Sequence, residues 1–155
     1  MEGAKEIKRV LCVGDNNTCR SPMFAALLKQ GFELAGKKVE VESAGIAEKA
    51  AGGNPADNMT TMPMESAGLS LHQHRSRWIG DIDDLSPFDL ILCMDQRIYE
   101  TVGWRQSTCL ETRIELADPL TGSIPSPARS QTAYNQCART ITATVQRLVG
   151  VMVPL

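Results

Sequence analysis

The sequence lacks several features that would point to specialised classes of protein. Aromatic residues make up 5% of the 155 residues, and no apolar run reaches the roughly 20 residues that a membrane-spanning helix needs. The 16 basic and 18 acidic residues nearly balance, so charge gives no reason to expect nucleic acid or an anionic membrane as a partner. Residues 1–10 lack the apolar core of a signal peptide, and we therefore expect a cytoplasmic protein.

Cysteine is present but not clustered. The cysteines are odd in number and scattered: Cys12, Cys19, Cys93, Cys109 and Cys137. No Cys-x2-Cys pair or Cys/His cluster indicates zinc, and the pattern favours free thiols in a reducing compartment. We expect neither a metal nor another cofactor.

Apolar runs and amphipathic segments alternate along the chain. Apolar or alternating runs predict strands at residues 8–13, 38–45, 88–94 and 112–116. Four helices are predicted from periodicity and end signals. They are a helix opened by Ser21 and Pro22 and ended by Gly36, one over 57–68 with Asp57 as a possible cap, a short one after Asp95, and one with apolar residues from Tyr134 to Val149.

This alternation predicts one α/β domain over residues 1–155. We expect three α/β/α layers, built as a four-stranded parallel sheet with helices on both faces. Ligands of such folds bind at the carboxyl ends of the strands. The 14–21 and 117–130 loops both follow predicted strands, so both are expected at that edge.

The segment VLCVGDNNTCRSP, residues 10–22, has the pattern of an anion site. A strand leads into a polar loop and then a helix, whose N-terminus carries partial positive charge. Successive backbone N–H groups in such a loop can form an anion nest, and Arg20 can hold two phosphate oxygens. An ordinary strand-to-helix connection is the alternative.

The same segment resembles the phosphate loop of low-molecular-weight protein tyrosine phosphatases, Cys-x5-Arg-Ser. The resemblance extends along the chain through VESAG (41–45), HRSR (74–77), DLILCMD (89–95) and Asp118-Pro119. It implies a phosphate or another oxyanion, or a phosphorylated protein or metabolite, as the partner. The implied phosphate-binding residues are Asp15, Asn16, Asn17, Thr18, Cys19, Arg20 and Ser21.

The sequence departs from the family pattern at the nucleophile. Five residues before Arg20, where the family has its catalytic cysteine, the count ends at Gly14. Glycine has no side chain that could attack phosphorus. Loss of a nucleophile costs about 10⁴–10⁶ in rate, whereas binding groups still act.

Three nearby residues are alternatives for the missing nucleophile. Cys12 lies two residues too early and is expected to be a buried strand residue. Cys19 matches a second loop cysteine of the family. Asp15 is a carboxylate beside the slot and could form a phosphoenzyme, or it could cap a turn.

The resemblance also assigns roles outside the loop. Asp118 is placed like the general acid, and His74 like the residue that braces the loop asparagine, here Asn17. Ser21 is expected to cap the helix. Lys49 and Leu120 stand where the family has aromatic walls for a tyrosyl ring, which puts phosphotyrosine specificity in doubt. Lys49 could meet a second anionic group or be a solvated loop residue.

Three functions are consistent with these residues. The first is a pseudophosphatase that binds a phosphoester without thiol chemistry. The second is an active phosphomonoesterase or tyrosine phosphatase whose nucleophile is Asp15, Cys19 or a water assisted by Asp118. The third is a non-catalytic interaction module in which the loop is unused.

Overall fold

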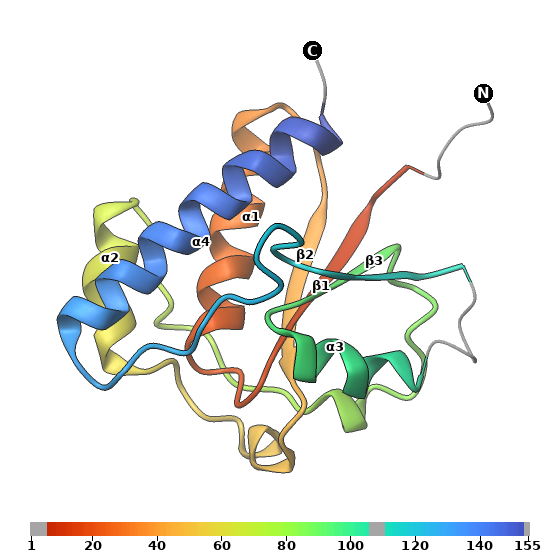
Figure 1. The fold of residues 1–155 in the computed structure, drawn as a ribbon, viewed down its shortest axis with the longest axis horizontal. Coiled ribbons are helices and arrows are strands. Elements are labelled where there is room, and N and C mark those ends of the chain that lie inside the picture. The colour runs from red at the N-terminus through yellow and green to blue at the C-terminus, as the bar shows by residue number, and fades with distance from the viewer. Residues whose placement is uncertain (1–5, 106–110, 154–155) are drawn as a thin grey trace.

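Four parallel strands form one sheet in the computed structural model, which describes residues 6–105 and 111–153 (Figure 1). Their order is β2-β1-β3-β4, and every neighbouring pair is parallel. The strands are β1 (Arg9–Gly14), β2 (Glu40–Gly45), β3 (Leu90–Cys93) and β4 (Arg113–Leu116). The predicted four-stranded parallel sheet is confirmed. Cys109 lies outside the described residues.

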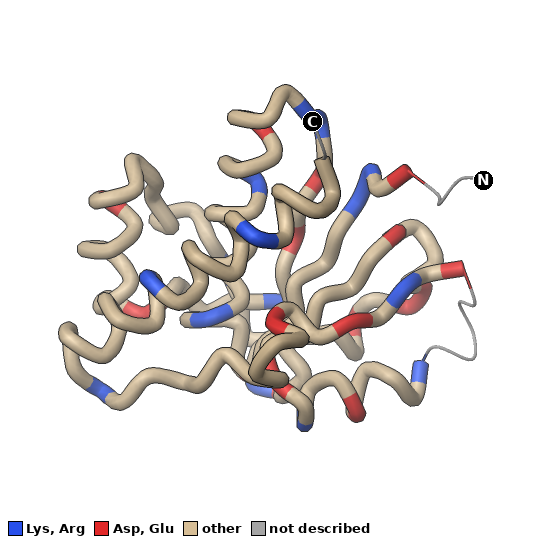
Figure 2. Tube along the Cα trace, turned by 45° about the horizontal axis from the view of Figure 1, so that its top comes forward, with Lys and Arg blue, Asp and Glu red and all other residues tan. Residues whose placement is uncertain are grey.

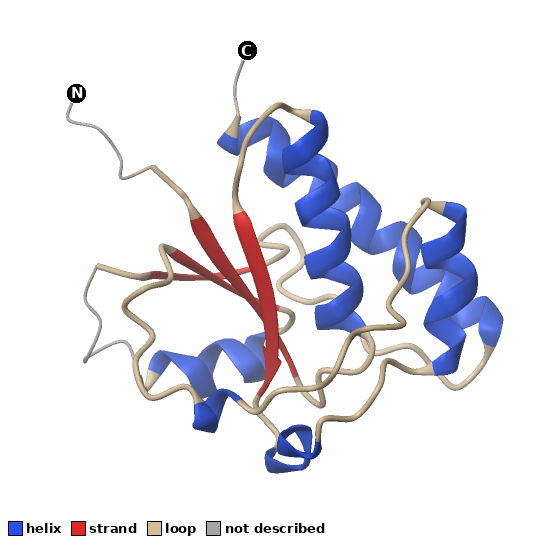
Figure 3. Cartoon of the chain, turned by 180° about the vertical axis from the view of Figure 1, so that it is seen from behind, coloured by secondary structure: helices blue, strands red, loops and turns tan. Residues whose placement is uncertain are grey.

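Helices cover both faces of this sheet. On one side lie α1 (Arg20–Leu34), α2 (Thr61–Ser66) and α4 (Gln131–Met152), and on the other lies α3 (Gln96–Gly103) (Figures 1 and 3). The short 3-10 helices are η1 (Glu48–Gly52), η2 (Asn58–Thr60) and η3 (Ile79–Asp81). The expected three-layer α/β/α architecture is therefore present. No helix in the described part of the chain is both long and apolar enough to cross a membrane.

The strand order follows from the distribution of apolar and charged residues. The central strands β1 and β3 are buried along nearly their whole length, as expected for apolar runs covered by helices on both faces. The outer strand β2 carries Glu42, which pairs with Arg9 and Arg77 at 2.8 Å each. Charges on an outer strand discourage pairing with another chain. Over the rest of the chain Lys and Arg are interspersed with Asp and Glu (Figure 2).

Two predicted helix starts need correction. Helix α1 begins at Arg20 with Cys19 at the N-cap, so Ser21 is not the cap. The Ser21 hydroxyl instead accepts a hydrogen bond from Asn17 Nδ2 at 2.9 Å. The predicted 57–68 helix is divided into η2 and a short α2, because Pro63 has no N–H to bond a carbonyl of the preceding turn. Asp57 makes no side-chain cap, and its carboxylate accepts a hydrogen bond from Tyr134.

The predicted helix ends at Gly36 and Gly68 are confirmed, and the structure adds two side-chain caps that were not predicted. Gly36 and Gly68 end their helices in the left-handed conformation, with φ of 75° and 76°. Asp95 caps α3 by accepting a hydrogen bond from the backbone N–H of Ile98 at 3.0 Å. Ser130 caps α4 in the same way.

The 14–21 loop and the segment after β4 meet at the carboxyl edge of the sheet, as predicted. Arg20 Nη1 donates to the backbone oxygen of Ile124 at 2.8 Å, although the two residues are 104 positions apart. The N–H of Ile124 in turn donates to the oxygen of Met94, directly after β3. The sheet thus brings the two loops together.

The buried β3 leucines should dominate stability. Leu92 is 1% exposed between the helical layers, so Leu92→Ala is expected to lower the free energy of unfolding by about 2–5 kcal/mol. Leu34→Ala makes the same chemical change at a side chain that is 83% exposed, and should alter it by about 0.5 kcal/mol or less. Urea denaturation of both variants checks this. Equal losses in the free energy of unfolding would contradict the position of the core.

Candidate functional site

The 14–21 loop lines a cavity of about 180 Å³ together with residues from three other segments. Within residues 6–105 and 111–153, no protein acceptor is bonded to the backbone N–H groups of residues 15–20. These donors precede or open α1, whose N-terminus adds partial positive charge. Donors without a protein partner beside a cavity can hold the oxygens of an anion.

Asn17 fixes the shape of this loop. Its φ of 61° makes it the one non-glycine residue of the described chain in the left-handed region, which asparagine tolerates better than most residues. Its Nδ2 donates to Ser21 Oγ and to Ser43 Oγ, at 2.9 Å each. Its Oδ1 accepts from the N–H of Arg77 at 2.8 Å. The buried amide therefore ties the loop to α1, to β2 and to the segment before η3.

His74 holds the backbone of the same residue. Its Nε2 lies 2.6 Å from the carbonyl oxygen of Asn17. Burial lowers the pKa of His74, and the charge of Arg75 lowers it further, against the opposing effect of this hydrogen bond. The imidazole is thus neutral at pH 7, and because a carbonyl only accepts, Nε2 must carry the proton. The structure places His74 where the sequence analysis expected a brace.

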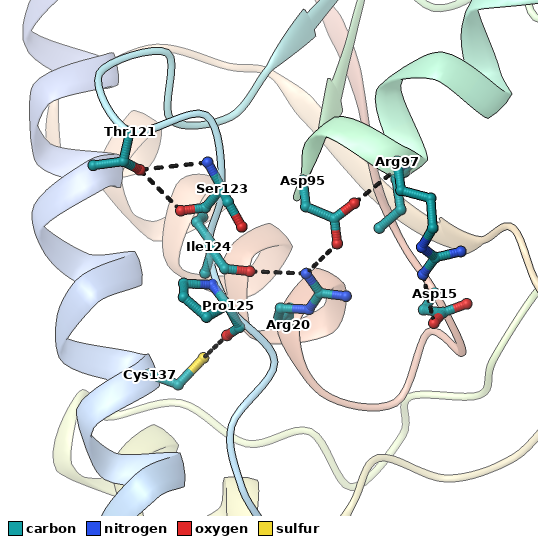
Figure 4. Close-up of polar contacts among 10 residues, drawn as sticks. Asp15, Arg20, Asp95, Arg97, Thr121, Ser123, Ile124, Pro125 and Cys137 are labelled. Carbon is teal, nitrogen blue, oxygen red and sulfur yellow. Dashed lines mark hydrogen bonds and ion pairs between the residues drawn. The ribbon is translucent and has the colours of Figure 1, made fainter.

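Arg20 is positioned by two acceptors (Figure 4). Its Nη1 donates to Asp95 Oδ2 at 2.9 Å and to the oxygen of Ile124 at 2.8 Å. Burial opposes ionisation of Asp95, but the hydrogen bonds from Arg20 and the Ile98 N–H, with the nearby positive charges, lower its pKa overall. No buried side-chain nitrogen of the described residues lacks a partner, so the other guanidinium nitrogens are bonded or reach solvent. The fork is therefore preorganised.

Gly14 ends β1 directly before the loop. Its φ is not in the left-handed region, so the backbone conformation does not require glycine. A Cβ added at Gly14 would lie 2.8 Å from Ser21 Oγ and 3.1 Å from Ser21 Cβ. The Ser21 hydroxyl thus occupies the space that a side chain at position 14 would need, and it would have to rotate to admit one.

Neither loop residue considered as a substitute nucleophile is free for attack in this structure. Asp15 Oδ2 is paired with Arg97 at 2.9 Å, turned toward α3 (Figure 4). The interaction of the Cys19 thiol with Cys137 of α4, together with burial, raises the pKa of Cys19 well above the ordinary value. Cys12 is fully buried within β1, as predicted.

Asp118 is buried and directed to other partners. Its Oδ2 accepts from the Thr121 hydroxyl at 2.8 Å, its Oδ1 accepts from the Leu120 N–H, and Arg147 of α4 lies 3.5 Å away. It is not among the residues that line the cavity. Protonation of a leaving group by Asp118 would require it to exchange these contacts for the ligand.

The cavity wall differs from the one expected from sequence. Lys49 lies on η1 and Leu120 is 74% exposed, and neither lines the cavity. The wall is made by residues that the sequence analysis did not single out for the site: Asp57, Ser126, Pro127, Arg129 and Tyr134. No sequence signal marks them, because they reach the loop only through the packing of η2 and α4 beside α1.

A family model described as low molecular weight phosphotyrosine protein phosphatase matches residues 9–152. The chain is a member of this family. The match runs from β1 to the last residue of α4, so the loop and its surroundings are all within the family's domain.

Several relatives match the chain over nearly their full length. It is 35% identical over 150 residues to a Ralstonia nicotianae protein described as "Probable low molecular weight protein-tyrosine-phosphatase EpsP", covering 96% of this chain and 95% of that one. A solved phosphatase of this family from T. tengcongensis has 25% identity and a TM-score of 0.81, covering 93% and 99% of the two chains. Vibrio vulnificus Wzb in complex with benzylphosphonate has 25% identity and a TM-score of 0.78, covering 94% and 99%.

Gly45 should be essential to the shape of the loop. A Cβ there would lie 2.3 Å from the backbone oxygen of Asp15 and 3.0 Å from the N of Asn17. We expect Gly45→Ala to displace the loop and cost about 1–3 kcal/mol in urea denaturation. Gly103→Ala, where an added Cβ meets nothing within 4 Å, is the control and should be neutral or slightly stabilising. If Gly45→Ala is as stable as the unmodified chain, the close approach of the Asp15 backbone to Gly45 is contradicted.

The raised pKa of Cys19 predicts slow alkylation. A thiol whose pKa is raised stays protonated at pH 7, and the thiolate is the reactive form. Labelling with iodoacetamide, read by peptide mass spectrometry, should therefore be slow at Cys19 at pH 7 and increase only well into the alkaline range. Rapid labelling of Cys19 at pH 7 would contradict the raised pKa and support Cys19 as a nucleophile.

Proposed function

We propose that this chain binds phosphate or a phosphoester in the 14–21 loop and does not carry out thiol-based phosphate hydrolysis. The observation that carries the proposal is Gly14 at the end of β1, five residues before the preorganised Arg20, with the Ser21 hydroxyl filling the adjacent space. Arg20 and the N–H groups of residues 15–20, which have no acceptor in the described part of the chain, supply binding, and Gly14 has no side chain to attack phosphorus.

Loss of the thiolate favours binding. A thiolate a few ångströms from a dianionic phosphate would repel it, and Gly14 removes that negative charge. The related Wzb of Vibrio vulnificus is described in complex with benzylphosphonate, whose phosphonate group presents tetrahedral oxygens like those of a phosphoester. By this relationship, a tetrahedral oxyanion is the ligand proposed for the present loop.

The alternative of an active phosphatase has weaker support from the described contacts. It requires Asp15 to leave Arg97, or Cys19 to ionise against its raised pKa. A water mechanism requires Asp118 to leave Thr121 and Arg147. A purely structural interaction module gives no reason for Arg20 to be buried with its fork held beside a cavity.

Hydrolysis of 4-nitrophenyl phosphate tests the proposal. The unmodified chain should show no turnover above a loop-disrupted Arg20→Ala control. Gly14→Cys should gain turnover as Ser21 rotates to admit the new side chain. Gly14→Cys/Ser21→Ala removes the 2.8 Å contact and separates failure to accommodate cysteine from failure of the loop. Calorimetry should show inorganic phosphate binding to the unmodified chain at least as tightly as to Gly14→Cys.

Each other outcome assigns a different function. Turnover by the unmodified chain that is lost in Arg20→Ala would contradict the proposal and direct mutation to Asp15 and Cys19. Absence of both turnover and phosphate binding in every variant would favour the interaction module.

A further inference from the structure

The segment from Ser123 to Ser130 forms a fixed rim over the 14–21 loop. Ile124 is tied to Arg20 through its oxygen and to Met94 through its N–H, both at 2.8 Å. Ser123 pairs with Asp95 in an isolated bridge. The oxygen of Pro125 contacts Cys137 Sγ of α4 at 3.8 Å (Figure 4).

The same rim is stiffened by its sequence. Pro125 and Pro127 restrict φ on either side of Ser126, and Ser130 ends the segment by capping α4. A rim held in this way needs little ordering when a ligand binds. Arg129 is carried by this rim, and it lines the cavity beside the loop.

The charges around the cavity leave Arg129 as an available cation. Four charged residues line it: Asp15, Arg20, Asp57 and Arg129. Asp15 is paired with Arg97, and Arg20 with Asp95. Within residues 6–105 and 111–153, Arg129 has no carboxylate within ion-pair distance. Its guanidinium is therefore free to meet an acidic group of a ligand.

The other lining carboxylate restricts where such a group can lie. The Asp57 carboxylate accepts a hydrogen bond from the Tyr134 hydroxyl at 2.8 Å. It repels an acid on its own side of the cavity, so attraction is confined to the side of Arg129. Lys49 and Leu120 lie outside the cavity lining, so neither side chain selects ligands by an apolar or aromatic group.

We infer that Arg129 forms a second anion subsite, and that the ligand of the 14–21 loop is a phosphomonoester carrying a further acidic group close to its phosphate. This inference rests on the proposed function, because it requires the loop to hold the phosphate. The cavity of about 180 Å³ suits a compact ester in which only a few atoms separate the two anions.

A pair of matched esters tests the subsite. Phosphoglycolate and 2-hydroxyethyl phosphate are similar in size, and only the former carries a carboxylate. Calorimetry should show phosphoglycolate binding about two- to fivefold tighter, the range for one partly exposed ion pair, with the preference falling as salt is raised. Arg129→Gln should abolish the preference, because its affinity for phosphoglycolate should fall by more than its affinity for 2-hydroxyethyl phosphate.

Arg139→Gln is the matched control. Arg139 lies on α4, contacts Gln136 and lines a different groove, so its loss should leave the preference intact. Suppose that inorganic phosphate binds. The subsite is then overturned if the unmodified chain does not prefer phosphoglycolate, or if that preference survives Arg129→Gln. If inorganic phosphate itself fails to bind, the proposed function and the subsite are both wrong.

A second pair of ligands shows whether the acidic phosphoester belongs to a protein or to a small molecule. Phosphoserine peptides with Asp or Asn next to the phosphoserine present the same chemistry from a protein. A preference for the Asp peptide that depends on Arg129 identifies an acidic phosphopeptide as a ligand. An Arg129-dependent preference confined to phosphoglycolate identifies a small phosphorylated acid.

Discussion

The buried amide of Asn17 is the constraint on which the site depends. A left-handed residue lets the chain turn between β1 and α1, and the Asn17 side chain joins this turn to Ser21, Ser43 and the N–H of Arg77. His74 completes the set from the backbone side. Because each polar atom of the amide is used, loss of one partner would leave a buried donor or acceptor unpaired. The turn is thereby held while the N–H groups of residues 15–20 have no acceptor among the protein residues that the structure describes.

A second set of contacts places the cation against that turn. Arg20 is held by Asp95 after β3 and by the oxygen of Ile124 in the segment after β4. The loop, the α3 cap and the rim are consequently coupled through one guanidinium. Gly14 contributes to this arrangement because it has no side chain, and the Ser21 hydroxyl lies close to where one would begin. On these contacts we propose that the site holds an anion and that position 14 supplies no atom for the family's nucleophilic step.

The sheet and the loop could be predicted because local patterns specify them. The apolar runs of β1 and β3 are buried on both faces, and the spacing from Gly14 to Arg20 fixes a strand, a polar turn and a helix. Periodicity alone predicts one helix over residues 57–68, whereas Pro63, which has no N–H, divides it into η2 and α2. Local sequence favours Ser21 as a cap, but its hydroxyl instead bonds the left-handed Asn17, whose position is set by tertiary contacts.

The surroundings of the site could not be predicted, for a physical reason. Asp95 is 75 positions from Arg20, and Cys137 contacts Cys19 only because α4 packs beside α1. The engagement of Asp118 with Thr121 and Arg147 likewise depends on where α4 lies. Sequence spacing carries no information on such contacts, so roles taken from the resemblance for Asp118, Lys49 and Leu120 stay predictions.

The most direct test of the central claim is a phosphate titration followed by 1H–15N correlation spectra of the unmodified chain. If the 14–21 loop is an anion site, saturable shifts should concentrate in the amide signals of residues 15–20 and in the Arg20 side chain, with those of the distant β4 unchanged. Shifts that are absent from the loop, or spread evenly over the surface without saturation, would contradict the account.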